Sequence, residues 1–293
     1  MNTFPPKAAP LSLDDLPRQS PWPAILLGAT PFTARHRTKE GIQREYGQEK
    51  WGKVLAWLKS HDSATEADLL RLQGLEPDSI IAFSEDAAFF TAPAAQVFES
   101  YRQCLLGVLR RYREEEALVE LGSGLGDKLL RFAAELKPRL ALGGEFTPSG
   151  VECGSILTRQ RRINATFVPF DFYEPRSVDF IPPGALVYTA HAIEQVPQLP
   201  EAFVEALLQR RPRTVVHFEP CYDERNDSSL VGLMRRRYTE INDYNRNLVP
   251  LLRRFEAQGK IRIVEHKADI FAVSPLNSTS VLVWQPADGG RTA

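Results

Sequence analysis

The chain has 293 residues, a formal net charge of −1, and 43% hydrophobic and 25% charged residues. This composition excludes disorder as the main state, and its balanced charge argues against a nucleic-acid or anionic-lipid partner. The three cysteines, Cys104, Cys153 and Cys221, are scattered, which excludes a disulfide framework. The sequence contains no long apolar run and no recognisable signal peptide. We therefore expect a cytoplasmic protein that does not span a membrane.

The first 114 residues predict an N-terminal arm and a helical lid. Proline-rich sequence over the first thirty or so residues cannot continue a helix, so we expect an extended arm there. A short helix should follow Ser63, with a capping box to Glu66. Apolar residues recur at helical spacing over 38–60 and 92–112, and the first stripe contains Ile42, Tyr46, Trp51, Val54, Leu55 and Leu58. The front portion is therefore expected to be all-helical.

Residues 115–293 predict a catalytic domain in which short apolar runs alternate with helical stretches, the pattern of βαβ units. Five strands are expected, at 117–121, 140–142, 165–170, 185–190 and 214–218. A long helix over 228–258, kinked at Pro250, leads to two strands near 261–265 and 280–284, which should be antiparallel because no helix joins them. The predicted fold class is α/β, with a Rossmann-like, mainly parallel sheet of seven strands and an antiparallel C-terminal pair behind the helical lid.

A glycine turn, Val119-Glu-Leu-Gly-Ser-Gly-Leu-Gly-Asp127, joins the first of these strands to a helix. Gly122, Gly124 and Gly126 allow a tight turn and the close approach of a ligand, and the helix beyond offers unpaired N–H groups. Asp127 stands where a dinucleotide fingerprint needs its last glycine. Glu120, just ahead of the glycines, suits a ligand with an ammonium and a sulfonium rather than phosphates.

This turn resembles the first motif of the class I S-adenosylmethionine-dependent methyltransferases, which reads acid-x-Gly-x-Gly-x-Gly. The final antiparallel strand pair is similar to the last two strands of their seven-stranded sheet, so the resemblance runs over roughly 115–286. It implies S-adenosylmethionine as the cofactor, with Glu145 on the ribose hydroxyls and Asp171 on the adenine amino group. The other expected cofactor contacts are Glu120, the three glycines, Phe146, Phe172 and His191, and Phe170 could also cover the ring.

Residues after the fourth and fifth strands should face the crevice of such a sheet, where the acceptor would bind. His191 could act as a general base or pack beside the cofactor, and Glu194 could bind an amine or cap a turn. Glu219 is expected to contact the substrate, whereas His217, within its strand, should be a core histidine. Further candidate acceptor contacts are Tyr222, Tyr238, Asn242 and Asn245.

These residues predict an enzyme that moves the methyl group of S-adenosylmethionine to N or O of a small polar metabolite. The acids at 194 and 219 indicate a cationic amine or a guanidine as acceptor. Alternatives are an NAD(P)-dependent oxidoreductase and a non-catalytic, methyltransferase-like interaction module. The clusters Arg159–Arg162 and Arg235–Arg237 should lie near a helix end or on an outward face without interleaved aromatics, so no nucleic acid is expected. No metal site is expected, and self-association is left open.

Overall fold

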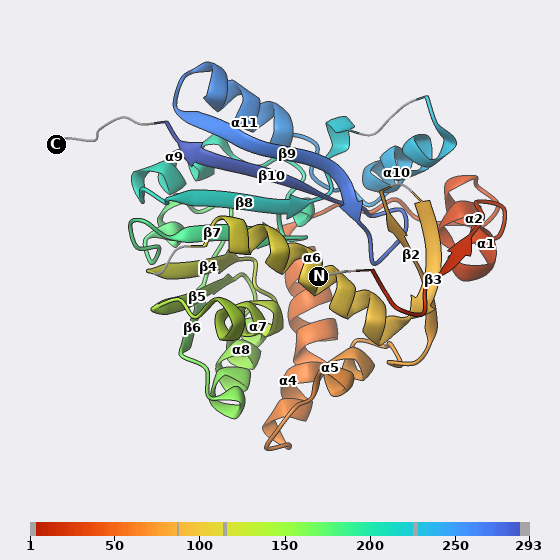
Figure 1. Cartoon of the computed structure of the whole chain (residues 1–293), viewed down its shortest axis with the longest axis horizontal. Helices are drawn as coiled ribbons and strands as arrows, with labels where there is room; N and C mark the ends of the chain where they lie inside the picture. Colours follow the sequence, from red (N-terminus) through yellow and green to blue (C-terminus); the bar gives the residue numbers. More distant parts are fainter. Residues whose placement is uncertain (1–3, 87, 114–115, 225–227, 288–293) are drawn as a thin grey trace.

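A seven-stranded sheet forms the centre of the computed structural model, which describes residues 4–86, 88–113, 116–224 and 228–287. Its strands are β4 (Ala117–Leu121), β5 (Leu140–Glu145), β6 (Ala165–Pro169), β7 (Leu186–Ala190), β8 (Thr214–Glu219), β9 (Ile261–Phe271) and β10 (Thr279–Pro286). The spatial order is β6-β5-β4-β7-β8-β10-β9 (Figure 1). Strands β4 to β8 are parallel, and β10 runs antiparallel to both of its neighbours. The predicted fold class is confirmed.

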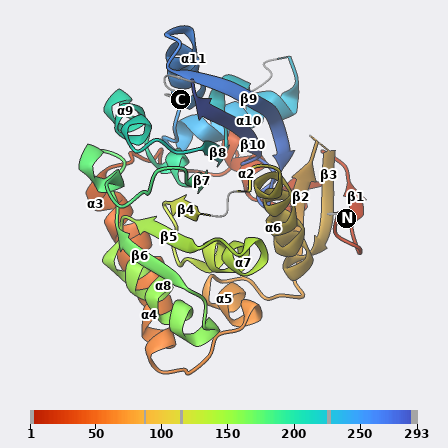
Figure 2. The same cartoon turned by 60° about the vertical axis from the view of Figure 1, so that its left-hand side comes forward.

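Helices cover both faces of this sheet (Figure 2). Three of them pack in one hydrophobic cluster, namely α6 (Ala94–Arg111), α7 (Asp127–Leu136) and α8 (Pro148–Arg161), and two in another, α9 (Glu201–Gln209) and α11 (Leu248–Ala257). Successive strand residues point to opposite faces, so Leu118 joins the first cluster and Val119 the second. Both are buried, because a sheet covered on each side has no solvated face.

The N-terminal part is not all-helical. Its elements are β1 (Ala9–Leu11), α1 (Leu16–Gln19), α2 (Trp22–Leu26), α3 (Lys39–Ile42), a π-helical stretch (Gln43–Lys50), α4 (Trp51–Lys59), α5 (Glu66–Leu72), β2 (Ile80–Glu85) and β3 (Ala88–Pro93). The three strands form a second sheet of order β1-β3-β2, and the expected extended arm is instead folded into β1, α1 and α2. A tight β2–β3 hairpin, with Asp86 at φ 44°, makes this sheet possible.

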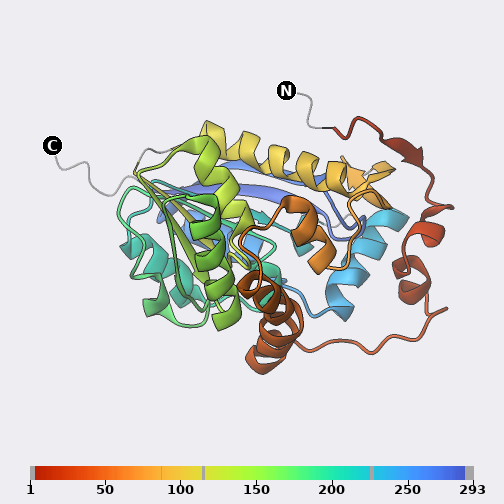
Figure 3. The ribbon, with the colours of Figure 1, turned by 90° about the horizontal axis from the view of Figure 1, so that it is seen from below.

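The chain between α2 and α3 runs past the C-terminal end of α10 (Leu230–Ile241) before it reaches the lid helices (Figure 3). The N–H of Arg35 donates to the carbonyl of Ile241 at 2.8 Å. The predicted helices at 38–60 and 92–112 are present as α3 to α4 and as α6. The predicted domain boundary, between residues 114 and 115, lies outside the described residues.

Two helix predictions need correction. The capping box of α5 joins Thr65 to Asp68, not Ser63 to Glu66, and the N–H of Asp68 donates to the Thr65 hydroxyl at 3.2 Å. The expected helix over 228–258 is two helices, α10 and α11, with Asn247 as the N-cap of the second and Asn245 Oδ1 accepting the N–H of Leu248 in the connecting turn. Pro250 causes no kink, since it lies in the first turn of α11, where its missing N–H loses no partner.

Arg235 on α10 is buried, in contrast to the expected outward position of its cluster. One guanidinium nitrogen lies 2.9 Å from Asp269 on β9, and the other donates to the hydroxyl of Ser84 on β2 at 2.9 Å. This arginine therefore connects α10 to both sheets and does not face the solvent.

Within the described ranges, no helix combines the length and the apolar character needed to cross a membrane.

His217 on β8 is the core histidine that its position in the strand predicted. The indole Nε1 of Trp284 donates to His217 Nε2 at 3.0 Å, and His217 Nδ1 lies 3.1 Å from the Thr189 hydroxyl. Because an indole N–H only donates, Nε2 must be unprotonated and the ring neutral. Burial lowers the pKa of His217 to about 3.

Acidification should therefore destabilise the protein through His217. Between pH 6.5 and about 3 the unfolded histidine binds a proton and the folded one does not, so stability is lost as the pH falls below 6.5. His217→Gln keeps an acceptor for Trp284 but does not titrate. Its deficit in unfolding free energy relative to the wild type should shrink by about 2 kcal/mol from pH 7 to pH 5 in urea denaturation. A deficit that is the same at both pH values would contradict this assignment.

Candidate functional site

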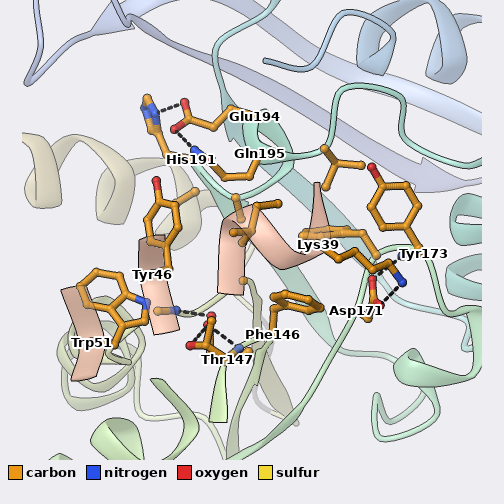
Figure 4. A pocket seen from close by; sticks show the side chains of 18 of the residues that line it. Lys39, Tyr46, Trp51, Phe146, Thr147, Asp171, Tyr173, His191, Glu194 and Gln195 are labelled. Atoms are coloured by element: carbon orange, nitrogen blue, oxygen red, sulfur yellow. Dashed lines mark hydrogen bonds and ion pairs between the residues drawn. The ribbon is translucent and has the colours of Figure 1, made fainter. Parts of the chain in front are cut away.

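The carboxyl ends of β4 to β7, together with the lid helices, enclose a cavity of about 280 Å³ (Figure 4). Eight of the residues expected in a site line it: Gly122, Gly124, Glu145, Phe146, Asp171, Phe172, His191 and Glu194. Parallel strands place their carboxyl ends at one edge, which is why residues from four separate segments meet there. Glu120, Gly126, Glu219, Tyr222, Tyr238 and Asn242 do not line it.

The glycine turn has the backbone that its sequence predicted. Gly122, Gly124 and Gly126 have φ values of 75°, 56° and 80°. A Cβ added at Gly122 would lie 2.3 Å from the Cβ of Ala192, and one at Gly126 would lie 2.3 Å from the ring of Phe167. The turn is therefore pressed against the segment that follows β7, with no room for side chains.

Glu145, at the end of β5, holds the glycine turn from the other side. Its Oε2 accepts the N–H of Gly124 at 2.8 Å, and its Oε1 accepts the N–H and the hydroxyl of Thr147 at 2.9 and 2.7 Å. Burial raises the pKa of Glu145, although the bonds from Thr147 oppose the rise. A carboxylate has about four lone-pair positions, so Glu145 can still accept from a ligand.

Asp171, after β6, lies at the opposite end of the cavity beside Phe146 (Figure 4). Its Oδ1 accepts the N–H of Tyr173 at 2.8 Å, and its Oδ2 is 2.5 Å from the ammonium of Lys39 on the lid. The Lys39 side chain is 46% exposed, so this ion pair is weak and exchangeable. A ligand that donates to Asp171 can replace Lys39 at little cost.

Glu120 faces into the protein rather than toward a ligand. It is fully buried, and its nearest cation is Lys128 on α7, with Nζ 3.6 Å from Oε1. Burial raises the pKa of Glu120 to about 7, while Lys128 opposes the rise. The expectation that Glu120 meets a positively charged ligand is thus corrected, because Lys128 supplies the positive charge and itself lines the cavity.

His191 and Glu194 form a hydrogen-bonded pair at the upper end of the cavity in Figure 4. His191 Nδ1 lies 2.8 Å from Glu194 Oε2, and Nε2 lies 2.7 Å from the Thr279 hydroxyl. Burial by itself lowers the pKa of His191, but the Glu194 carboxylate outweighs it, so the pKa is raised. With both ring nitrogens engaged, the predicted general-base role would require Thr279 to be displaced.

Glu219, predicted to contact the substrate, points away from the cavity. Its Oε1 accepts the N–H groups of Ala192 and Ile193 at 3.0 and 3.1 Å, and its Oε2 accepts that of Glu194 at 3.1 Å. Burial raises the pKa of Glu219 to about 7, against the opposing charge of His191. The residue holds the turn after β7, so its expected role is corrected from substrate binding to support of that turn.

The remaining acceptor candidates also lie elsewhere. The Tyr222 hydroxyl donates to Glu240 at 2.9 Å, and Tyr238 packs edge-to-face on Trp22. Asn242 is buried and donates to the carbonyl of Tyr238 at 2.9 Å. Asn245 lies in the turn before α11, where its Oδ1 accepts the N–H groups of Asn247 and Leu248. For Tyr238, Asn242 and Asn245, periodicity on the predicted helix could not distinguish packing positions from cavity positions, and for Tyr222 its place after the fifth strand could not.

Lid residues that were expected only to pack complete the cavity. Tyr46 and Trp51 line it, and the π-helical stretch between Gln43 and Lys50 determines where they face. Such stretches recur at functional sites. Their apolar stripe looked like an ordinary packing face, so no sequence signal singled them out. Gln195, next to Glu194, was missed for a similar reason, because a lone amide has no motif.

The strand order, the antiparallel β10 and the glycine turn at the end of β4 define the fold of the class I S-adenosylmethionine-dependent methyltransferases, as the sequence predicted. Solved structures with a similar fold include magnesium protoporphyrin IX methyltransferase from Synechocystis PCC 6803 with bound SAH, at 10% identity and a TM-score of 0.49, covering 84% of this chain and 99% of that one. Geranyl diphosphate C-methyltransferase from Streptomyces coelicolor A3(2) is 12% identical, with a TM-score of 0.48 and coverage of 66% and 83%.

A third similar structure, MtNAS in complex with MTA and tNA, is 11% identical, with a TM-score of 0.47 and coverage of 85% of this chain and 72% of that one. No family model and no curated protein matches the sequence. At these identities the similarity is one of fold and does not extend to a substrate.

A methyl group at Gly122 should be far more disruptive than one at Gly184. Both residues have a positive φ, 75° and 77°, so alanine is strained at each by about 1 kcal/mol. Only at Gly122 does the added Cβ collide with the protein, while nothing lies within 4 Å at Gly184. Gly122→Ala should therefore lower the unfolding free energy by about 2–4 kcal/mol and Gly184→Ala by about 1 kcal/mol, measured in urea. Equal losses of unfolding free energy would show that the turn at Gly122 is not in tight contact with Ala192 in the segment after β7.

Proposed function

We propose that this chain binds S-adenosylmethionine in the cavity at the carboxyl ends of β4 to β7 and transfers its methyl group to a small polar acceptor. The observation that carries the proposal is the convergence of Glu145, Asp171 and Glu194, from three separate strand ends, on the larger of two cavities that the glycine turn borders. When bound, S-adenosylmethionine supplies an electrophilic methyl group on a sulfonium.

The cavity end at Asp171 suits the adenosine half. Phe146 and Phe172 offer apolar surface for a flat ring, and Asp171 can accept from an exocyclic amino group. Glu145 already accepts three hydrogen bonds from Gly124 and Thr147, so it has about one lone-pair position left for a ribose hydroxyl, and a second hydroxyl would have to replace one of those donors. A nicotinamide dinucleotide fits less well, because its pyrophosphate would meet acids at this edge and the turn ends on Asp127 instead of glycine.

The cavity end at His191 suits a cation. His191 lies between Glu194 and the turn held by Glu219; the Glu194 carboxylate raises the pKa of His191 against the effect of burial, and burial raises the pKa of Glu219 to about 7. His191 holds the pKa of Glu194 below its usual range, although burial opposes this, and Glu194 therefore stays ionised. A sulfonium placed beside this end would be stabilised by the carboxylate of Glu194.

The chain's contribution to the reaction is alignment. Methyl transfer is an in-line displacement that requires no protein nucleophile. The lid residues Tyr46 and Trp51 close the cavity and exclude water, and the turn at His191 is fixed from behind by Glu219. An acceptor held at Glu194 would be kept in one orientation.

The acceptor that fits this end best is an amine. Glu194 Oε1 accepts from the amide of Gln195 at 2.8 Å, and its Oε2 accepts from Asn277 at 3.0 Å. The carbonyl oxygens of Gln195 and Asn277 are buried and accept no hydrogen bond from the residues the structure describes. Two acceptor atoms without donors favour a donor-rich ligand such as an amine, which binds as an ammonium and must release a proton to solvent before its nitrogen lone pair attacks the methyl group and displaces S-adenosylhomocysteine. The guanidine arrangement that paired Glu194 with Glu219 is not available, since Glu219 is occupied by the backbone.

Loss of the Asp171 carboxylate should weaken adenosine binding. Asp171→Ala should lower the affinity for S-adenosylhomocysteine about 10-fold or more in isothermal titration, the usual loss for a charged hydrogen bond. Glu174→Gln, which changes an exposed acid three residues away and outside the cavity, is the matched control and should bind normally. Heat from NADH and none from S-adenosylhomocysteine would reject methyl transfer in favour of an oxidoreductase.

Removing the charge of Glu194 should selectively impair methylation of amines. With a panel of amines, guanidines, phenols and carboxylic acids, mass spectrometry should show a one-CH₂ gain on an amine, at a rate about 10-fold or more lower for Glu194→Gln. Affinity for S-adenosylhomocysteine, which lacks the sulfonium charge, should change little in this variant. Methylation of a phenol alone, or amine methylation that is unaffected by Glu194→Gln, would refute the amine assignment.

A further inference from the structure

Tyr46 brings a hydroxyl of the lid into the larger cavity. Figure 4 shows its ring above Trp51, with the hydroxyl pointing toward the end where His191 and Glu194 lie. Within the described part of the chain, no group forms a hydrogen bond with this hydroxyl. A phenol can donate one hydrogen bond and accept another, so it is available to a ligand at that end.

The π-helical stretch Gln43–Lys50 places this hydroxyl. The N–H of Trp51 donates to the carbonyl of Tyr46, five residues earlier. In an α-helix, side chains five residues apart point about 140° from each other, because each residue turns the helix by about 100°. The wider π-helical turn brings them onto nearly the same face, so both side chains line the cavity. A regular α-helix here would turn one of them away from the ligand.

The ring of Tyr46 is held at its faces and not at its hydroxyl. The ammonium of Lys50 lies 4.0 Å from the ring centroid and also pairs with Glu45 at 2.9 Å. The ring of Trp51 packs against it, with the two centroids 5.8 Å apart. Both contacts involve the ring alone, so the ring should keep its position when the hydroxyl is removed.

The hydroxyl stays neutral although a carboxylate is near. Burial raises the pKa of Tyr46, and the negative charge of Glu194 adds to the rise. Glu194 itself already accepts three hydrogen bonds from its neighbours, which leaves about one lone-pair position for a ligand. A nitrogen bound between them therefore meets one acceptor on the wall after β7 and another on the lid.

We propose that the hydroxyl of Tyr46 accepts one N–H of the amine acceptor while the wall at Glu194 accepts another, and that this arrangement limits the enzyme to adding one methyl group. The inference rests on the proposed function, because it takes methyl transfer to an amine as given. A neutral primary amine has two N–H groups and one lone pair. With one N–H held by each wall, the lone pair is left to face the methyl group.

The number of N–H groups changes after one transfer. The bound ammonium first releases a proton to solvent, and its lone pair then forms the N–C bond while the S–C bond breaks and leaves its electron pair on sulfur. When the methylated product in turn releases a proton, it has only one N–H. In a second transfer, its methyl group would lie against Tyr46 or Glu194, and that acceptor would lose its partner. A second transfer should therefore be slower.

Tyr46→Phe tests this arrangement with two matched substrates. The probes are each primary amine that the wild type methylates, and the N-methyl derivative of that amine. In the wild type, kcat/KM should be about 10-fold or more higher for the primary amine, and mass spectrometry should show the gain of a single CH₂. Tyr46→Phe should lower kcat/KM for the primary amine about 3- to 10-fold and leave that for the derivative unchanged or higher, so that product with a second CH₂ appears.

Binding gives a second readout that does not depend on turnover. In isothermal titration of protein saturated with S-adenosylhomocysteine, the primary amine should bind Tyr46→Phe about 3- to 10-fold more weakly than the wild type. The affinity for S-adenosylhomocysteine itself should change less than about twofold. Tyr222→Phe is the matched control, because its hydroxyl binds Glu240 and it does not line the cavity, and it should alter none of these values.

The outcomes separate this inference from the proposed function. No binding of S-adenosylhomocysteine by the wild type would overturn both. Failure to methylate any amine, equal rates for successive transfers, or equal losses for the two amines in Tyr46→Phe would reject the inference while cofactor binding stands. A loss of affinity for S-adenosylhomocysteine in Tyr46→Phe would assign the hydroxyl to the cofactor and reject the inference as well.

Discussion

The buried carboxylate of Glu219 organises the site. It accepts three consecutive backbone N–H groups, those of Ala192, Ile193 and Glu194, directly after β7. These bonds shape the turn that brings Ala192 against Gly122 and sets His191 at a φ of 55°. A non-glycine residue holds such a backbone only when its surroundings compensate for the strain. Glu219 itself does not reach the cavity. It nevertheless fixes the turn, and so determines the positions of the side chains on that turn that line the cavity.

Each acid near the cavity has a cation or a set of donors within the chain. Asp171 has Lys39, Glu120 has Lys128, Glu194 has His191, and Glu145 has Gly124 and Thr147. Buried charges are costly unless they are paired, so this internal matching lets the site exist before a ligand arrives. The pairs differ in how easily they exchange: Lys39 is exposed and easily displaced, whereas Glu219 is locked by the backbone.

The lid is part of the fold and not a detached flap. Arg37 is almost fully buried, pairs with Glu45 at 2.9 Å, and donates to the carbonyl of Asn242 at 3.1 Å. Ser149 on α8 donates to the carbonyl of Gly47 at 2.7 Å. These bonds connect the lid to α8 and to the end of α10, so Tyr46 and Trp51 reach the cavity in defined positions. The lid residues form one wall of the cavity, and the strand ends form the other.

The sequence alone determined the sheet, the glycine turn and the cavity positions of Glu145, Asp171, His191 and Glu194. The periodicity of a strand and the position of a residue just after it can be read from a short stretch of sequence. Because parallel strands end at the same edge of the sheet, these local features predict where such residues lie in the fold. Tertiary structure decided the rest: that Glu120 faces Lys128, that Glu219 binds backbone, that Tyr222, Tyr238 and Asn242 lie elsewhere, and that Tyr46 and Trp51 line the cavity. These outcomes depend on which buried groups come into contact between segments that are distant in the sequence. Such contacts produce no periodic pattern in the sequence, so they could not be predicted from it.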